Sequence, residues 1–341
     1  MSATFARLLS TGALAFMLAS PTSGLAEAVT LRFATFEPPT TPVSVMFQTW
    51  IDQVNAASEG ALDIQFFPGG ALGRDPRTQL ELVQNGVTDI AFGFPFLTPN
   101  KFPDDMVTTL PLIIANAHEG TYAHWRLYER GLLRGWDDVV PLMLCTPSPV
   151  NVLSTEEVAD LSSLSGLRGS ATSPIAQEIL TALGAVPVSG FNFSNAAEAM
   201  SRGQLDFDLI GFMPASVFRQ IEVATSALMI PLGASPCAVF MNRDVYEGLP
   251  EAARAVLDEH RGMPLGLMWA DVIDSVESTV RAQFVGQEGN SINELTDEQM
   301  ARATEVTQPI VDAWIASNPN GTALVSALRE EVEALRNGAE W

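Results

Sequence analysis

Several side chains that could do chemistry lie close together in one segment of this chain, residues 166–212. The segment holds Arg168, Ser170, Asp206 and Asp208. Carboxylates accept hydrogen bonds or pair with cations, and a serine hydroxyl can donate or accept. The segment contains no Gly-x-Ser-x-Gly elbow, Walker A loop or Gly-x-Gly-x-x-Gly turn, which are the patterns of a nucleophile or a phosphate site. These residue types therefore indicate a site that holds a molecule rather than one that converts it.

Two other groups of titratable residues form no catalytic pattern. His118 and His124 are six positions apart, a spacing that matches no zinc signature, and we interpret them as residues that decorate a helix. Glu156 and Glu157 are adjacent, so on an extended strand their side chains point to opposite faces. We therefore expect a protein that is not an enzyme and that has no metal or other cofactor.

The segment around these residues alternates between strand and helix patterns. Strand-like runs at 166–171, 186–188 and 203–210 are separated by helical runs at 174–183 and 195–201. Strands that alternate with helices of this length predict a parallel sheet. In open parallel sheets the ligand lies beyond the carboxyl ends of the strands. We therefore expect ligand contacts near Ser170, Phe191 and the stretch from Asp208 to Phe212.

The first third of the chain shows the same alternation. Strand patterns at 30–35, 62–67 and 88–93 enclose helical patterns at 43–58 and 77–85. Prolines follow within three residues of the first and third strands, at Pro38 and Pro95, and proline cannot continue a ladder. These stops place four residues at strand ends, where a ligand can be met: Phe36, Glu37, Phe94 and Phe96.

Composition excludes one large class of function. The 341 residues include 18 basic and 40 acidic side chains, for a formal net charge of −22. Nucleic-acid binding needs a basic face, so we exclude it. The length is sufficient for two domains with cores of their own.

The N-terminus reads as an export signal. Arg7 precedes a short apolar run from Leu8 to Ala19, and small residues suited to cleavage follow by residue 28. This pattern predicts a signal peptide over residues 1–28 and a periplasmic mature protein. Export places Cys145 and Cys237 in an oxidising compartment, where either a disulfide or two buried thiols is compatible with the sequence.

Several motifs together resemble the solute-binding proteins of TRAP (tripartite ATP-independent periplasmic) transporters. The resemblance covers essentially the whole mature chain. It rests on Phe67-Pro68-Gly69-Gly70-Ala71-Leu72-Gly73, Glu81-Leu82-Val83-Gln84-Asn85-Gly86, Asp89-Ile90-Ala91, Leu164-Ser165-Gly166-Leu167, Met200-Ser201-Arg202-Gly203-Gln204-Leu205-Asp206, and Phe240-Met241-Asn242 with Leu249-Pro250.

The resemblance implies an α/β fold of the two-domain periplasmic-binding-protein type. It implies crossing strands, a long bridging helix over 264–287, and a ligand cleft between domain I (29–151 plus 236–275) and domain II (152–235 plus 276–341). A final helical pair, 297–317 and 322–337, is expected to pack on domain II. The implied function is a monomeric receptor that closes on a small organic solute and delivers it to the TRAP membrane permease subunits.

The chain departs from this family where a carboxylate ligand is usually clamped. The position of the usual arginine is Ser170, a frequent second arginine aligns with Glu156, and the usual asparagine is Ile210. An unpaired buried carboxylate is costly, so we expect a ligand that is not a simple monocarboxylate. Glu37 and Asp208 would serve as acceptors, and phenylalanine rings, Phe212 among them, as faces for a cation. The alternatives are an organic-acid receptor with Arg168 as the clamp and a periplasmic hydrolase or lyase.

Overall fold

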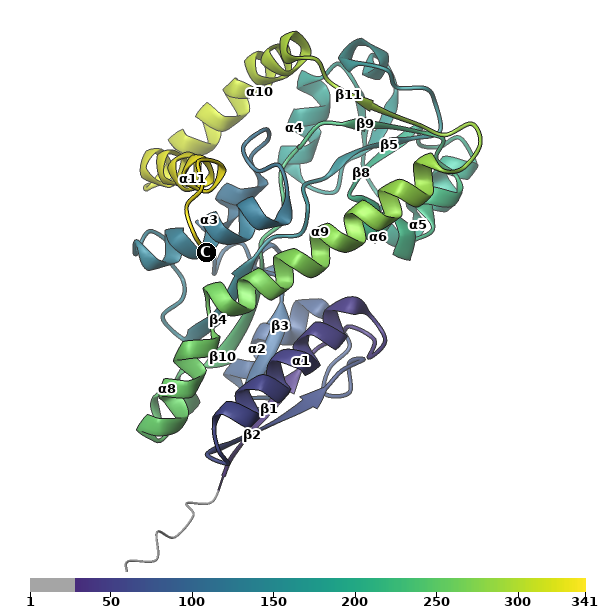
Figure 1. The fold of residues 1–341 in the computed structure, drawn as a ribbon. Helices are drawn as coiled ribbons and strands as arrows, with labels where there is room; N and C mark the ends of the chain where they lie inside the picture. Colours follow the sequence, from purple (N-terminus) through teal and green to yellow (C-terminus); the bar gives the residue numbers. More distant parts are fainter. Residues whose placement is uncertain (1–27) are drawn as a thin grey trace, which may run out of the picture.

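The computed structural model describes residues 28–341, so nearly all of the predicted signal peptide lies outside the described residues. Two sheets organise the chain (Figure 1). The first has the order β2-β1-β3-β10-β4, and β10 is antiparallel to both of its neighbours. Its strands are β1 (Val29–Ala34), β2 (Leu62–Phe67), β3 (Ile90–Gly93), β4 (Val139–Cys145) and β10 (Cys237–Asn242).

The second sheet has the order β11-β9-β5-β8-β6-β7. Its β5 strand is antiparallel to β8 and β9, and β6 is parallel to β7 and β8, so the parallel pairing predicted for residues 166–212 is confirmed. The strands are β5 (Asn151–Ser154), β6 (Arg168–Ser170), β7 (Val186–Val188), β8 (Phe207–Ile210), β9 (Ser226–Met229) and β11 (Ser291–Glu294).

Helices cover both sheets, and their starts follow local capping signals. Thr41 accepts from the Ser44 amide at the start of α1, and Ser173 does the same for Ala176 at the start of α4; such caps satisfy amides that a helix leaves unpaired. The α-helices are α1 (Pro42–Ala57), α2 (Gln79–Gln84), α3 (Ala117–Glu129), α4 (Pro174–Ala182), α5 (Phe193–Ser201), α6 (Phe212–Val217), α7 (Arg243–Glu247), α8 (Glu251–His260), α9 (Met263–Val285), α10 (Asp297–Ser317) and α11 (Gly321–Arg336). Short 3₁₀ turns are η1 (Pro76–Thr78), η2 (Pro95–Leu97), η3 (Asp105–Thr109), η4 (Leu161–Leu164) and η5 (Gln220–Glu222).

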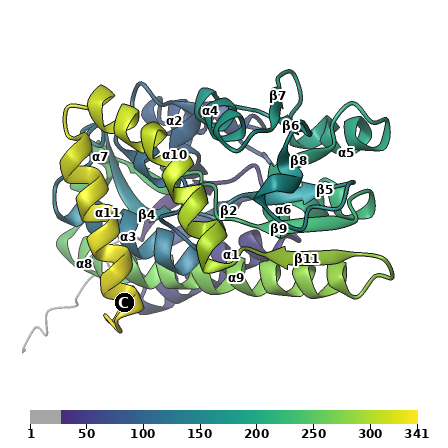
Figure 2. The same ribbon diagram turned by 90° about the horizontal axis from the view of Figure 1, so that it is seen from above.

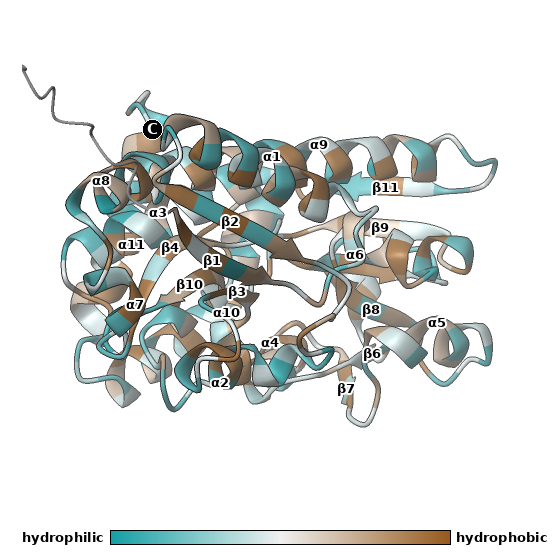
Figure 3. Ribbon diagram, turned by 90° about the horizontal axis from the view of Figure 1, so that it is seen from below, coloured by the Kyte–Doolittle hydropathy of each residue, from teal (hydrophilic) through white to brown (hydrophobic). Residues whose placement is uncertain are grey.

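The chain crosses between the sheets twice, from β4 to β5 and from β9 to β10. Because β10 and β5 run antiparallel to their neighbours, both crossings join the edges at which the parallel strands end. Figure 3 shows β1 and β2 running toward the side where β8 and α6 of the second sheet lie. The carboxyl ends of the strands of both sheets therefore lie at the boundary between the domains, where open α/β sheets bind ligands.

The long helix α9 spans both domains, as Figure 2 shows from above. Near its start the Trp269 ring packs on Phe92 of the first sheet, with ring centroids 5.4 Å apart. Near its end Phe284 packs on Phe212 of the second domain, at 5.5 Å. Both ends are thus held by buried aromatic contacts, so the predicted two-domain α/β fold with a bridging helix is confirmed.

The final helical pair does not pack as predicted. Helix α10 lies against α4 of the second domain, but α11 lies against α3, beside the first sheet (Figure 2). The buried face of α11 includes Leu324 and Leu328, which join the same apolar cluster as Ala123 and Leu127 of α3. The expectation that both helices pack on the second domain is therefore wrong for α11. Periodicity identified the apolar stripe of this helix and could not identify its partner.

The two cysteines face each other on neighbouring strands. Cys145 at the end of β4 is in register with Cys237 at the start of β10, and a disulfide joins them with Cα atoms 4.9 Å apart. Both residues are fully buried. The disulfide lies within the first sheet, directly next to both crossings.

Candidate functional site

An aromatic wall stands at the carboxyl edge of the first sheet. Phe36 follows β1 and packs on Phe94, which follows β3, with centroids 5.4 Å apart; Phe94 in turn packs on Phe96 at 5.2 Å. All three rings are partly exposed. Glu37 lies beside this wall, and burial raises the pKa of its carboxyl. The structure thus brings together the four residues predicted at this edge.

The facing edge of the second sheet carries Ser170 and Asp208. Ser170 ends β6, Asp208 lies within the neighbouring β8, and both side chains are buried. Burial raises the pKa of Asp208 to about 6, against the weaker opposing effects of Gln220 and Ser170 beside it. The hydroxyl of Ser170 and Oδ2 of Asp208 have no hydrogen-bond partner among the described residues. This edge therefore carries buried acceptor oxygens at the position where the family resemblance would place an arginine to bind a carboxylate.

Arg168 is engaged elsewhere. Its backbone amide and its guanidinium both bind Asp206, the latter through Nε at 3.0 Å and Nη2 at 2.6 Å. This ion pair raises the pKa of Arg168 and lowers that of Asp206. Glu156, exposed after the end of β5, lies at the same edge, because Thr155 binds the carbonyl of Asp206. These three residues therefore lie at the opposite end of the strands from Ser170.

The two remaining predicted phenylalanines differ in their surroundings. Phe212 is the first residue of α6, and its ring is buried against Phe284 in the core of the second domain. Phe191 precedes α5 and is only partly buried on the same apolar cluster. The ring of Phe212 therefore belongs to the domain core, whereas Phe191 retains an exposed surface.

Two carboxylates of α9 bind the starts of helices from different domains. Asp274 accepts from the amides of Ala117 and His118 at the start of α3, at 2.9 and 3.2 Å. Glu277, three residues later, accepts from the amides of Phe212 and Met213 at 2.7 and 2.8 Å. Carboxylates are favoured at helix starts by the unpaired amides and the helix dipole. These two contacts tie α9 to both domains.

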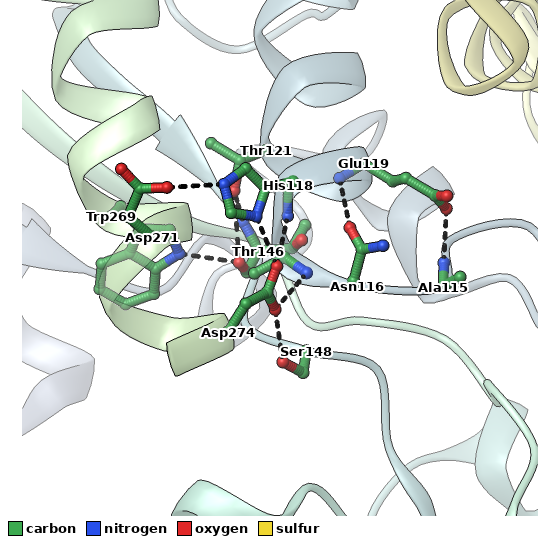
Figure 4. A network of polar contacts seen from close by, with 11 residues as sticks. Ala115, Asn116, His118, Glu119, Thr121, Thr146, Ser148, Trp269, Asp271 and Asp274 are labelled. Carbon is green, nitrogen blue, oxygen red and sulfur yellow. Dashed lines mark hydrogen bonds and ion pairs between the residues drawn. The ribbon is translucent and has the colours of Figure 1, made fainter. Parts of the chain in front are cut away.

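The contacts of Asp274 form a network at the first crossing (Figure 4). Its carboxylate also accepts from Ser148 Oγ at 3.1 Å and lies 2.6 Å from His118 Nδ1. The other ring nitrogen of His118 lies 2.9 Å from Asp271. Carboxylates at both ring nitrogens suit a doubly protonated imidazolium. His118 therefore anchors α3 to α9 at the crossing. Both histidines lie on a helix, as expected, but they do more than decorate it, because His124 makes a fully buried pair with Asp105.

A pH dependence of stability follows from His118. Burial lowers its pKa, but the carboxylates of Asp274 and Asp271 outweigh this effect and raise it. A histidine whose folded pKa is raised stabilises the fold fully below its unfolded value of about 6.5 and loses this contribution as the pH rises through the folded pKa. We expect the melting temperature of His118→Gln to fall further below that of the native protein at pH 5.5 than at pH 9. A difference that does not change with pH would contradict this.

Several residues of the site had no signal in the sequence. Gln220 reaches Asp208 from η5, and Asp274 and Glu277 reach two domains from one helix. Arg74, on the loop after β2, is exposed, and its neighbour Asp75 is bound by Arg77. For Asp274 and Glu277, the one available signal in the sequence is their i, i+3 spacing on the same helix.

Residues 28–341 contain neither a metal-binding cluster nor a membrane-spanning helix. This part of the chain has no cluster of three or more His, Cys, Asp or Glu side chains arranged to hold a metal ion. It also has no helix that is both long and apolar enough to cross a membrane.

Two α/β domains, a bridging helix and acceptors at facing strand ends define a two-domain ligand-binding protein. The family model "Bacterial extracellular solute-binding protein, family 7" (DctP) matches residues 33–318. This chain belongs to that family, the solute-binding proteins of TRAP transporters, which bind small organic solutes and work with a membrane permease.

Two curated proteins are similar along nearly their whole length. The outer membrane transporter protein TsaT of Comamonas testosteroni is 23% identical over 97% of this chain and 99% of its own. The C4-dicarboxylate-binding periplasmic protein DctP of Rhodobacter capsulatus is 26% identical over 88% of this chain and 91% of its own.

Solved structures show the same fold. A TRAP periplasmic solute-binding protein from Desulfovibrio salexigens aligns with a TM-score of 0.82 and 24% identity, over 92% of this chain and 98% of that one. One from Rhodoferax ferrireducens, in complex with copurified benzoate, aligns with a TM-score of 0.79 and 22% identity, over 92% and 100%.

Proposed function

We propose that this protein is an exported receptor that binds one small organic solute between its domains, closes on it and delivers it to a TRAP permease. The observation that carries this proposal is the placement of the strand ends of both sheets at the domain boundary, beside two short crossings. A solute that contacts both edges favours the closed arrangement by its differential affinity for it. Export of the mature chain to the periplasm is part of the same proposal.

We further propose that this solute is not a simple monocarboxylate. Ser170 stands where the family's arginine is usual, and Asp208 beside it is a buried carboxyl. Glu37 adds a second acid at the facing edge, where burial raises its pKa. An anion placed between these groups would meet like charges without a cationic fork to bind it. The two edges therefore favour a neutral solute or one with a positive group.

The second candidate is a receptor for organic acids, and one observation supports it. Arg168 does not suit the role of clamp, because its guanidinium is bound to Asp206. Arg74, in contrast, is exposed after the end of β2, at the carboxyl edge of the first sheet. The related structures include complexes with benzoate, mandelate and glucuronate. An organic acid bound by Arg74 of the first domain would be consistent with the exposure of Arg74 and with the acids in the related structures.

A ligand screen followed by scattering tests the proposal. We expect thermal-shift screening of matched amines, alcohols and carboxylates to find a solute that raises the melting temperature. Small-angle scattering should then show a smaller radius of gyration at saturation with that solute. An unchanged radius at saturation would count against closure. A hit confined to simple carboxylates, and lost in Arg74→Ala, would establish the second candidate instead.

A further inference from the structure

Asp208 is a buried carboxyl with no cation to pair with it. Only 1% of its surface is exposed, and its Oδ2 atom has no hydrogen-bond partner within residues 28–341. Arg168, on the neighbouring strand, pairs with Asp206 instead. A buried charge is normally paired, because burying it alone is costly. We therefore expect the cationic partner of Asp208 to come from outside the chain.

Two further unpartnered oxygens belong to the neighbours of Asp208. Ser170 and Gln220 are the two side chains that lie beside its carboxyl, and their donor groups partly offset the effect of burial on its pKa. Their Oγ and Oε1 atoms are buried and have no hydrogen-bond partner among the described residues. The Gln220 amide nitrogen donates to the carbonyl of Phe193 at 3.5 Å, which leaves its oxygen as the acceptor. Three elements, β6, β8 and η5, thus contribute polar side chains to one cluster, and each of these side chains has a buried oxygen without a partner among the described residues.

We propose that Asp208, Ser170 and Gln220 bind the ammonium group of the transported solute. This inference rests on the proposed receptor function, because Ser170 ends β6 at the edge where the solute is expected. A primary ammonium carries three N–H donors and one positive charge, which matches three oxygens of which one belongs to a carboxylate. A carboxylate ligand would be repelled, and an alcohol offers one donor for three acceptors. The solute class is therefore a primary amine, an amino alcohol or an amino acid.

Calorimetry with matched compounds tests the assignment. The probes are benzylamine, benzyl alcohol and benzoate, and 2-aminoethanol, ethylene glycol and glycolate, together with any hit of the thermal-shift screen. We expect the amine of a set to bind more tightly than its alcohol and carboxylate. Asp208→Asn should weaken amine binding at least about 30-fold, since one partner of a buried charge pair is lost. Ser170→Ala should weaken it about 10-fold.

Glu156→Gln is the matched control, because Glu156 is an exposed acid at the opposite end of the same sheet. It should leave amine binding unchanged, and circular dichroism of each variant checks that it is folded. Amine binding that survives Asp208→Asn, or hits among alcohols or carboxylates alone, would overturn the ammonium site and leave the receptor function standing. Binding of no compound from any of the three classes would overturn both.

Discussion

Replacing Cys145 and Cys237 together by alanine is expected to lower the free energy of unfolding by about 2 to 4 kcal/mol. The disulfide closes a loop across a sequence separation of 92 and joins β4 to β10 beside both crossings. A cross-link over a loop of this length restricts the unfolded chain strongly, so its loss stabilises the unfolded state. Urea unfolding of the native and doubly substituted proteins measures the difference.

The native protein in reducing agent is the control for this prediction. It keeps both sulfur atoms in the buried strands and lacks only the cross-link, so it separates the cross-link from lost packing. We expect it to unfold at a urea concentration close to that of the alanine variant. Two free thiols in the unfolded, unreduced native protein would contradict the prediction, since no disulfide would then be present to lose.

The second large effect is expected at Asp208. Burial raises its pKa from 3.8 to about 6, which corresponds to about 3 kcal/mol between its two protonation states. For an acid with a raised pKa, this cost is absent below pH 4, develops between about pH 4 and 6, and is complete above. Asp208→Asn removes the ionised form. The solute-free variant should therefore be more stable than the native protein by about 3 kcal/mol at pH 8, and similar to it at pH 4.

Chemical unfolding at the two pH values measures this effect, with Glu156→Gln as the exposed control. A loss of stability in Asp208→Asn at pH 8 would show that the carboxylate has an internal partner and that its role is structural. The expected gain would instead show that the native Asp208 lowers the stability of the solute-free protein, as residues of binding sites often do. Read with the binding experiment, the result separates a ligand contact from a packing role.

Local sequence signals predicted the elements of the fold well. Prolines after Glu37 and Phe94 place those residues at strand ends, because proline cannot continue a ladder. The helix over 264–287 corresponds to α9, Met263–Val285, because an uninterrupted helical pattern needs no distant partner to be recognised. The packing of α11 on α3 was missed, because an apolar stripe shows that a helix is covered and does not show by what.

By itself the sequence determined the alternation of strands and helices, the edges at which those strands end, and the presence of Ser170 where the family usually has an arginine. These are properties of single residues and of their near neighbours, and backbone stereochemistry translates them directly. Only the tertiary structure decided which residues the side chains of the site contact. It bound Arg168 to Asp206, placed Gln220 beside Asp208, and gave Asp274 and Glu277 helix starts in different domains. Such pairings depend on strand register and helix packing between residues far apart in the chain, and no local pattern carries that information.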